Sequence, residues 1–438
     1  MKNRIAIIGA GYTGLSCAKK LIENNYNVTI IESTDEIGGI AKCIDFNEKK
    51  IEKHYRHIFK SDKYVIDMIK EFDLVDKLHW NETKMAYYDK EGGLYAFGTP
   101  YTLLKYKPLT FVQKLLFGIS VIKIKIIKNY KKIENYTAEE WIKKNCGEKV
   151  YKKIWEPLLI TKFGEYKNKI SMSWLWGKIN LRSSSSTLEG ERLGYLEGSF
   201  DILTRKLGEF LIKNNCKIEL NSSVKKVTKS KTGYRVETDK NEEEFDYIIN
   251  TTAYDISKNI FKEILTKEEK EKIKKMKYTS ARTMIIFSKK SLTKYYWINI
   301  GDRNFPFGGI IEHTNMEKKD NYNNTNIIYI SNYMYKNDRL YNLNEKELFD
   351  EYLPFLQKIN RNFTKEDVIK IECFSEMYAQ PIIETEYSKE LLNEKITSNG
   401  VFMATMAQIY PEDRGMNYAI KLGYEVAEKI INEKRIEN

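Results

Sequence analysis

Three glycines and one acidic residue near the start of the chain have the spacing of a site for a phosphate-bearing dinucleotide. Gly9, Gly11 and Gly14 form the pattern GxGxxG, and Glu32 follows about 20 residues later. In this pattern the first glycine allows a tight turn, the second lets the backbone approach a pyrophosphate, and the third allows close helix–strand packing. The acidic residue accepts hydrogen bonds from ribose hydroxyls. NAD and FAD both use this chemistry, and these residues alone leave the choice open.

Other chemistry-bearing residues are sparse. The chain has four histidines and five widely spaced cysteines, and none of them has the spacing of a zinc site, so we expect no metal. An odd number of scattered cysteines argues against a disulfide framework and favours a reduced, cytoplasmic compartment. Two of the histidines, His54 and His57, share the short basic stretch 53–57, where an imidazole can move protons.

The residues around the glycines predict the elements that must position them. An apolar run at 4–8 precedes Gly9, apolar residues at helical spacing occupy 15–23, and a second apolar run at 28–31 ends at Glu32. Strand, glycine turn, helix, strand and acid form the context in which GxGxxG is informative. We therefore expect a parallel βαβ unit with phosphates at the helix N-terminus.

The segment 32–39, Glu-Ser-Thr-Asp-Glu-Ile-Gly-Gly, resembles the flavin amine oxidase superfamily. This superfamily includes protoporphyrinogen oxidases and phytoene desaturases and is related in fold to UDP-galactopyranose mutases. There the ribose-binding acid is followed by such a glycine pair, which lines FAD. The resemblance thus implies FAD and gives Gly38 and Gly39 a place beside it; no cysteine follows Cys373, so we expect a non-covalent cofactor. The superfamily usually has an arginine after the pair, whereas this chain has Ile40 and Ala41.

Two later segments resemble the superfamily's other contributions to its FAD domain. Near the C-terminus, Gly415-Met416-Asn417 opens a predicted helix, which in the superfamily points its N-terminus at the isoalloxazine ring. A helix N-terminus stabilises negative charge that develops on the reduced ring. In mid-chain, the resemblance implies that Val224 meets the adenine through its backbone.

The resemblance implies an α/β fold in which a Rossmann-like FAD-binding domain of the GR2 type carries an inserted α+β substrate domain. The FAD-binding domain is discontinuous in this expectation and comprises 1–80, 191–258 and 396–438. The substrate domain comprises 81–190 and 259–395.

Patterns within the expected substrate domain predict helices first and then a sheet. Helices are predicted at 110–128, 137–144 and 151–159, the second with a capping box from Thr137 to Glu140. Alternating apolar and polar residues around 283–287 and 326–330 predict an antiparallel sheet.

The distribution of charge and of apolar residues indicates which classes of molecule the protein can bind. The net charge of +12 is spread along the chain without a nucleic-acid-binding module, so we expect a solvated cationic surface, a small-molecule substrate and no nucleic acid. Residues 115–128 combine an apolar body with a basic end, which allows a peripheral membrane contact. We favour a buried helix of the substrate domain instead. The oligomeric state is open.

Three residues are candidates for catalysis. In the superfamily the chain after the glycine pair passes beside the flavin, and UDP-galactopyranose mutases have a comparable His-rich stretch there. His57 is then placed to move protons, or to position a substrate anion together with Arg56. Lys162 lies in Pro157-Leu-Leu-Ile-Thr-Lys-Phe-Gly164, which resembles a stretch of protoporphyrinogen-oxidase-like proteins. A lysine beside flavin can bind a water molecule or stabilise anionic flavin.

These features favour an FAD-dependent oxidase or dehydrogenase that removes hydride from a small or lipophilic substrate. No second GxGxxG in a strand–turn–helix context is found for NAD(P)H, which supports hydride removal from substrate. The alternative is a redox-neutral nucleotide-sugar mutase that resembles UDP-galactopyranose mutase, which the His54/His57 stretch and the cationic balance suit. A flavoprotein that serves as a binding partner with little catalysis is a third reading.

Overall fold

The computed structural model describes residues 3–91, 93–187, 190–397 and 399–437. Its first sheet is parallel and five-stranded, in the order β19-β13-β1-β2-β9, and its strands come from distant parts of the chain. These strands are β1 (Arg4–Ile8), β2 (Asn27–Ile31), β9 (Lys217–Glu219), β13 (Tyr247–Asn250) and β19 (Val401–Met403). All residues of β19 and nearly all of β1 are buried, as expected of a parallel sheet covered on both faces.

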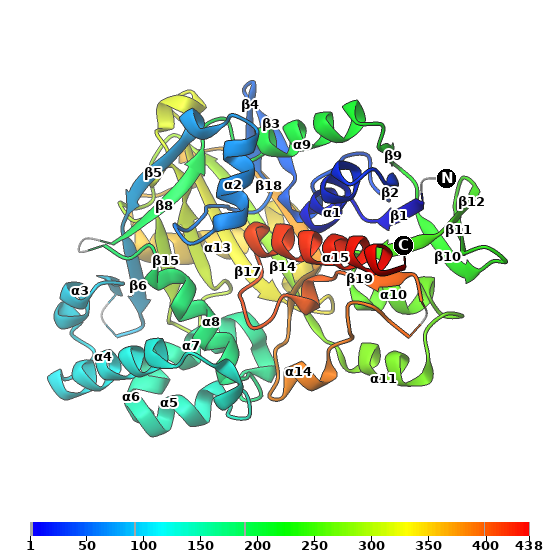
Figure 1. Ribbon diagram of the computed structural model, residues 1–438. Coiled ribbons are helices and arrows are strands. Elements are labelled where there is room, and N and C mark those ends of the chain that lie inside the picture. The colour runs from blue at the N-terminus through cyan, green and yellow to red at the C-terminus, as the bar shows by residue number, and fades with distance from the viewer. Residues whose placement is uncertain (1–2, 92, 188–189, 398, 438) are drawn as a thin grey trace.

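Helices from both ends and from the middle of the chain pack together beside this sheet (Figure 1). They are α1 (Tyr12–Glu23), α2 (Lys63–Glu71), α9 (Asp201–Lys213) and α15 (Met416–Glu437). Helices α1 and α15 meet at Gly423, where an added Cβ would lie 2.4 Å from the carbonyl oxygen of Thr13. The predicted parallel βαβ unit and the α/β class are therefore confirmed, and the C-terminal helix completes the unit formed by the N-terminus.

A second, seven-stranded sheet follows the order β18-β14-β17-β16-β15-β6-β7. Its strands are β6 (Met85–Asp89), β7 (Gly93–Ala96), β14 (Tyr278–Ser288), β15 (Trp297–Ile300), β16 (Gly309–Glu312), β17 (Asn326–Met334) and β18 (Val368–Pro381). Strands β14 and β17 pair antiparallel with Thr283 opposite Ser331, which confirms the predicted antiparallel pair. The domain boundaries themselves stay a prediction.

Smaller elements connect and cover the two sheets. The additional strands are β3 (Cys43–Phe46), β4 (Lys49–Glu52), β5 (Leu78–Thr83), β8 (Glu191–Leu196), β10 (Val224–Lys229), β11 (Tyr234–Thr238) and β12 (Glu242–Phe245). Further helices are α10 (Tyr254–Ile260), α11 (Lys267–Lys275), α12 (Arg339–Asn342), α13 (Glu345–Ile359) and α14 (Tyr387–Glu390).

A layer of helices lies beside the seven-stranded sheet. It contains α3 (Pro100–Lys105), α4 (Phe111–Ile126), α5 (Ala138–Cys146), α6 (Glu148–Val150), α7 (Glu156–Phe163) and α8 (Met172–Ser183). The predicted capping box is present: Thr137 accepts from the backbone N–H of Glu140, whose side chain accepts from that of Thr137. The helix expected at 151–159 differs, because Tyr151–Trp155 is a π-helical turn that leads into α7.

The expectation that α4 is a buried helix is wrong. Only Ser120 and Ile124 are buried, while seven apolar side chains of this helix face solvent. Helical periodicity identifies an apolar face but does not reveal whether another element covers it. Among the described residues, no helix is both long and apolar enough to cross a bilayer.

Candidate functional site

A cavity of about 710 Å³ lies beside the glycine turn that follows β1 and the acid that follows β2. It brings together most of the residues that the sequence singled out. Those that line it are Gly9, Gly11, Glu32, Gly38, Gly39, Arg56, His57, Lys162, Gly415, Met416 and Asn417. Their convergence from distant parts of the chain makes this cavity the candidate site.

The glycine turn forms one wall of the cavity. Gly9 has a φ of 104°, a backbone conformation that residues other than glycine rarely adopt. A Cβ on Gly14 would lie 2.1 Å from the Gly9 carbonyl oxygen, so Gly14 packs beneath the turn instead of lining the cavity. A Cβ on Gly11 would meet no atom within 4 Å, which leaves the backbone open to a ligand.

The carboxylate of Glu32 is held firmly at the end of β2. One oxygen accepts from the backbone N–H of Ala10 at 2.8 Å, and the other accepts from the backbone N–H and the hydroxyl of Thr34 at 2.9 and 2.7 Å. Glu32 is buried but lines the cavity. The acid is thus oriented before any ligand arrives, as a ribose-binding carboxylate requires.

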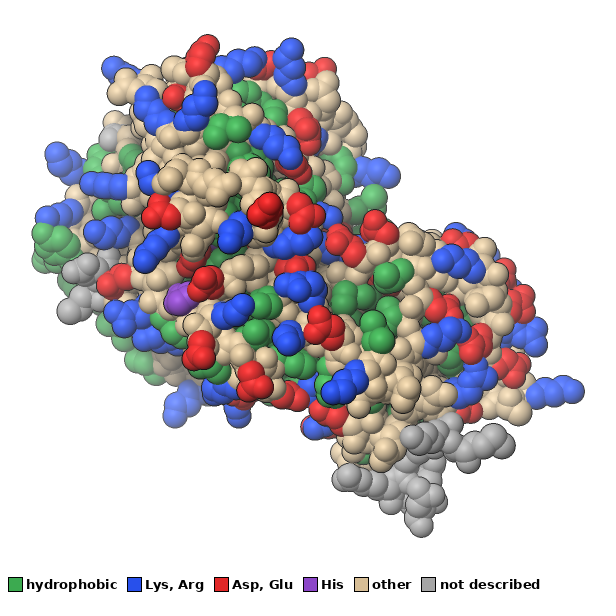
Figure 2. Space-filling model, turned by 90° about the horizontal axis from the view of Figure 1, so that it is seen from above, with side chains coloured by type: hydrophobic (Ala, Val, Ile, Leu, Met, Phe, Trp, Pro, Cys, Tyr) green, Lys and Arg blue, Asp and Glu red, His purple; other side chains and the backbone are tan. Residues whose placement is uncertain are grey.

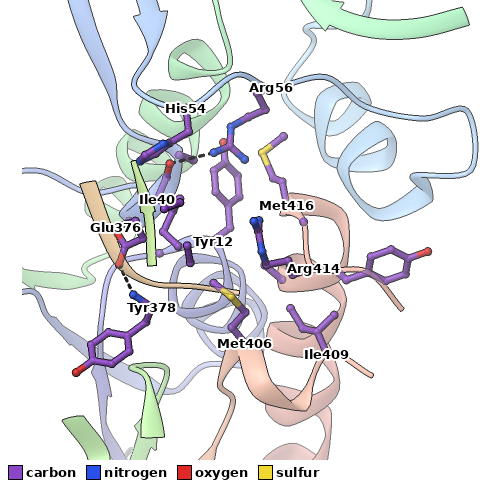
Figure 3. A pocket seen from close by; sticks show the side chains of 18 of the residues that line it. Tyr12, Ile40, His54, Arg56, Glu376, Tyr378, Met406, Ile409, Arg414 and Met416 are labelled. Atoms are coloured by element: carbon purple, nitrogen blue, oxygen red, sulfur yellow. Dashed lines mark hydrogen bonds between the residues drawn. The ribbon is translucent and has the colours of Figure 1, made fainter. Parts of the chain in front are cut away.

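Arg56 lies against the loop that carries the glycine pair. Its Nη2 donates to the carbonyl oxygen of Ile40 at 3.0 Å, while its buried Nε has no hydrogen-bond partner among the described residues. Figure 3 shows Arg56 close to Ile40, with Met416 and Arg414 around the same pocket. The chain therefore places a guanidinium on this loop although no arginine follows Gly38-Gly39 in the sequence.

The two histidines of the basic stretch are partly buried and neutral. His57 shares a hydrogen bond of 2.8 Å between its Nδ1 and the hydroxyl of Tyr296, and His54 shares one with the hydroxyl of Thr283. Burial lowers the pKa of each imidazole to about 3, and the neighbouring arginines add to this. His57 therefore enters any reaction as a neutral imidazole, and a cationic role in binding an anion does not fit it.

Two lysines share one carboxylate at the far side of the cavity. Lys178 Nζ donates to one oxygen of Asp413 at 2.6 Å, and Lys162 Nζ lies 3.9 Å from the other. Burial lowers the pKa of both lysines to about 8, although Asp413 opposes this. Burial alone would raise the pKa of Asp413, but Lys178 and Lys162 hold it below its ordinary range. Lys162 Nζ is too far from Asp413 for a hydrogen bond, and it lies 5.1 and 5.3 Å from the centres of the Trp174 and Tyr333 rings.

Two arginines add to the positive charge of this end. Arg414 donates to Gln380 and to the hydroxyl of Tyr333 at 3.1 and 2.6 Å. Arg182 pairs with Glu191 at 3.2 Å, and its guanidinium lies 5.2 Å from the centre of the Trp297 ring. We call the group formed by Lys162, Lys178, Arg182, Asp413 and Arg414 the cationic cluster; all five line the cavity.

The sequence did not single out Lys178, Arg182 or Arg414. Lys178 and Arg182 are four residues apart, so they share a face of α8, and that spacing was the one available signal. Nothing in the sequence shows that this face meets Asp413, more than 200 residues away.

Two predicted cofactor residues are placed differently from the rest. The side-chain oxygen of Asn417 accepts from the backbone N–H groups of Tyr64 and Val65 at 2.8 and 3.3 Å, in the first turn of α2. Asn417 therefore joins the start of α15 to the start of α2. Val224 begins β10 and is not among the described residues that line the cavity, so its contact with adenine stays a prediction.

The polar groups of the cavity fit a large, polar ligand such as FAD. Arg56 Nε and Asp413 Oδ1 are buried and lack hydrogen-bond partners among the described residues, which is costly unless a ligand supplies them. The open backbone at Gly11 and the oriented Glu32 carboxylate suit the pyrophosphate and ribose of such a ligand.

Comparison with known proteins agrees with this geometry. Residues 12–431 match the family described as flavin containing amine oxidoreductase. Over 163 residues the chain is 28% identical to 15-cis-phytoene desaturase of Synechococcus elongatus, a match that covers 34% of each protein. The chain spans at most 42% of the phytoene desaturases that it matches.

Two solved structures have a similar fold over nearly the whole chain. A candidate protoporphyrinogen oxidase from Exiguobacterium sp. 255-15 has a TM-score of 0.80 at 16% identity, with 99% of both chains covered. A reduced UDP-galactopyranose mutase has a TM-score of 0.78 at 15% identity, with 98% of this chain and 96% of that chain covered. Identities this low show a shared fold.

Proposed function

The chain belongs to the flavin containing amine oxidoreductase family, and from this premise we propose that it is an oxidase or dehydrogenase acting on an anionic small molecule. Family membership confirms the predicted class, an FAD-dependent oxidoreductase, and with it the predicted cofactor. The class of substrate and the transfer of electrons to an acceptor are our proposal. Bound FAD would accept a hydride from the substrate and pass the electrons on to an acceptor.

In this proposal, residues at the glycine-turn end of the cavity bind FAD. The backbone at Gly9 and Gly11 would approach the pyrophosphate, and Glu32 would accept hydrogen bonds from the ribose hydroxyls. Arg56 moves from its predicted catalytic role to this group, because it already contacts the loop of the glycine pair. Its unpartnered Nε can donate to an anionic oxygen of the cofactor.

The charge of the cationic cluster is the observation that favours an anionic substrate. Four of its members are cations and one, Asp413, is a carboxylate; with Glu191, which pairs with Arg182, and Glu376, which also lines the cavity, the group still has a net positive charge. A protonated amine brought to this end of the cavity would be repelled, whereas a carboxylate or phosphate group would find the N–H donors of Lys162. The substrate class thus departs from the amines that the family description suggests.

A redox-neutral nucleotide-sugar mutase is the second candidate. The cationic cluster suits a diphosphate as well as a carboxylate, and the fold is shared with a UDP-galactopyranose mutase. His54 and His57 do not support this candidate further, because both are neutral and engaged by hydroxyl groups.

The first experiment is the visible spectrum of the purified protein, followed by identification of the cofactor that denaturation releases. Carboxylate- and phosphate-bearing candidates are then added without oxygen, with putrescine and other amines as the matched panel. We expect anionic compounds to bleach the flavin and amines to leave it unchanged. Bleaching by amines alone would contradict the proposed substrate class. Turnover of a nucleotide sugar only after dithionite reduction would select the mutase.

A further inference from the structure

Helices α3 and α4 present a row of apolar side chains to solvent. Val112, Leu115, Ile119, Ile122 and Ile126 follow one another at intervals of three or four residues, so they share one face of α4. We define the α3–α4 surface by the exposed apolar side chains of these helices, Tyr101, Leu104, Phe111, Val112, Leu115, Leu116, Ile119, Ile122 and Ile126. Most of them are more than half exposed. A contiguous apolar surface of this kind marks an interaction site in a water-soluble fold.

The opposite face of α4 anchors the helix to the rest of the protein. Ser120 and Ile124 are buried, and the Phe117 ring stacks on Trp155 with 5.5 Å between ring centres. Figure 1 shows α3 and α4 at an outer edge of the molecule, on the opposite side from the N-terminus. The α3–α4 surface is therefore held in place while no described element covers it.

The segment of the chain that carries this surface has charges of one sign. Residues 92–133 contain eight lysines and no aspartate or glutamate. None of these eight lysines forms an ion pair with a described carboxylate, although lysines elsewhere, such as Lys143 with Glu139, commonly do. On the face seen in Figure 2, by contrast, basic and acidic side chains are interspersed. An apolar surface rimmed by unpaired lysines matches a partner that is both apolar and negatively charged.

We propose that the α3–α4 surface docks on a bilayer that contains anionic phospholipids. The apolar side chains would enter the boundary between headgroups and acyl chains, and the lysines would contact the headgroups. A second copy of the chain would complement the surface poorly, because symmetric contact would bring unpaired lysines against lysines. This surface is separate from the cavity, and the proposal does not depend on the substrate.

Co-sedimentation of the FAD-loaded protein with vesicles tests the apolar part. Vesicles of phosphatidylcholine alone are compared with vesicles that also contain phosphatidylglycerol, for the wild type and the double variant Leu115→Glu, Ile122→Glu. We expect binding to the anionic vesicles that the double variant lowers roughly tenfold or more. The matched control is Ile212→Glu, because Ile212 is 65% exposed on α9, outside this surface. An unchanged visible spectrum shows that each variant is folded.

A second pair of variants tests the charge. Lys123→Gln, Lys125→Gln and Lys128→Gln together should weaken vesicle binding roughly tenfold or more, and salt should weaken wild-type binding. The control combines Lys262→Gln, Lys267→Gln and Lys274→Gln, which are exposed lysines without an ion pair among the described residues. Equal losses in both triple variants would overturn the proposal, since only net charge would then matter.

Two further outcomes would also overturn it. One is wild-type binding to anionic vesicles no stronger than to phosphatidylcholine vesicles. The other is a lipid-free dimer, measured by light scattering, that Leu115→Glu with Ile122→Glu converts to a monomer; the surface would then serve self-association.

Discussion

Arg56 lies on the loop of the glycine pair with one hydrogen bond to Ile40 and one unpartnered donor, Nε. A charged hydrogen bond contributes about 1.5–3 kcal/mol, and tenfold in affinity corresponds to about 1.4 kcal/mol. We therefore expect Arg56→Ala to weaken FAD binding by about 10- to 100-fold, measured by fluorescence titration of the apoprotein. Arg192→Ala, at an exposed position, serves as the control. If the two variants bound FAD with equal affinity, Arg56 would not contact the cofactor, and its predicted role in positioning the substrate would be favoured again.

Lys162 and Lys178 give the cavity a pH dependence. With pKa values of about 8, both are protonated below pH 8 and lose their charge as the pH rises through it. Arg414 stays charged throughout because its pKa is raised, and Asp413 stays ionised because its pKa is depressed. The affinity for an anionic substrate should thus fall as the pH rises through 8, measured as the substrate Kd on both sides of that pH. The fall should be smaller in Lys162→Gln; an affinity that rises with pH would argue for a cationic substrate.

Single residues also show what sequence reasoning can and cannot find. The positions of Gly9, Gly11 and Glu32 beside the cavity were predictable because they depend on local spacing within one βαβ unit, whereas their roles toward FAD stay a prediction. The neutrality of His57 was not, because it results from burial and from a hydrogen bond to Tyr296, which is 239 residues away.

At the scale of elements, α2 begins with backbone donors that a residue of α15 satisfies. Asp62, the residue before α2, makes no side-chain capping bond to the helix, and Asn417 accepts from the N–H groups of Tyr64 and Val65 instead. Loss of a cap costs about 0.5–2 kcal/mol. We expect Asn417→Ala to lower the free energy of unfolding by about that amount in denaturant titration, and Asn417→Asp to restore much of it. A variant that loses FAD affinity with no change in stability would instead support a direct cofactor contact.

Two helical glycines offer a matched comparison of packing. A Cβ at Gly423 of α15 would lie 2.2 Å from the Ser16 hydroxyl and 2.4 Å from the Thr13 carbonyl oxygen, whereas one at Gly118 of α4 would meet nothing within 4 Å. Gly423→Ala should destabilise the protein by about 1–3 kcal/mol through overpacking. Gly118→Ala should stabilise it by up to about 1 kcal/mol through helix propensity. Thermal unfolding of both variants checks this, and similar shifts would mean that α15 can move away from α1.

The sequence predicted where a helix or strand begins and ends better than it predicted which other elements pack against it. The apolar repeat of α4 predicted the helix to within two residues at each end. The side of the helix that faces the protein depends on α5 and α8, and the repeat contains no information about them.

At the scale of the whole molecule, the five-stranded sheet depends on the last forty residues. Strand β19 pairs with β13, and α15 packs on α1 and α2. We expect a chain that ends at Gly400 to bind no FAD and to be largely insoluble, because β13 becomes an uncovered edge and the apolar face of α1 is exposed. Soluble yield and visible absorbance measure this. A chain that ends at Glu433 keeps both elements and should retain the cofactor; a yellow, soluble product of the shorter chain would contradict the dependence.

The α/β class and the discontinuous contribution to one sheet were predictable because each segment has its own local pattern of strand, turn or helix. The contact of α7 and α8 with the loop at Asp413 was not predictable. It arises from packing between distant segments, and no sequence motif links them.

The late position of β19 also has a consequence for synthesis. Ribosomes add about 5–20 residues per second, so about 20–80 seconds separate the emergence of β1 from that of β19. During this interval the nascent sheet has an open strand edge, first at β1 and then, once β13 has emerged, at β13, and helix α1 lacks the cover of α15. Both features favour aggregation. Nascent-chain protection by a chaperone is therefore expected to matter more for this protein than for one whose nucleotide-binding half is contiguous, and slow translation should lower its yield.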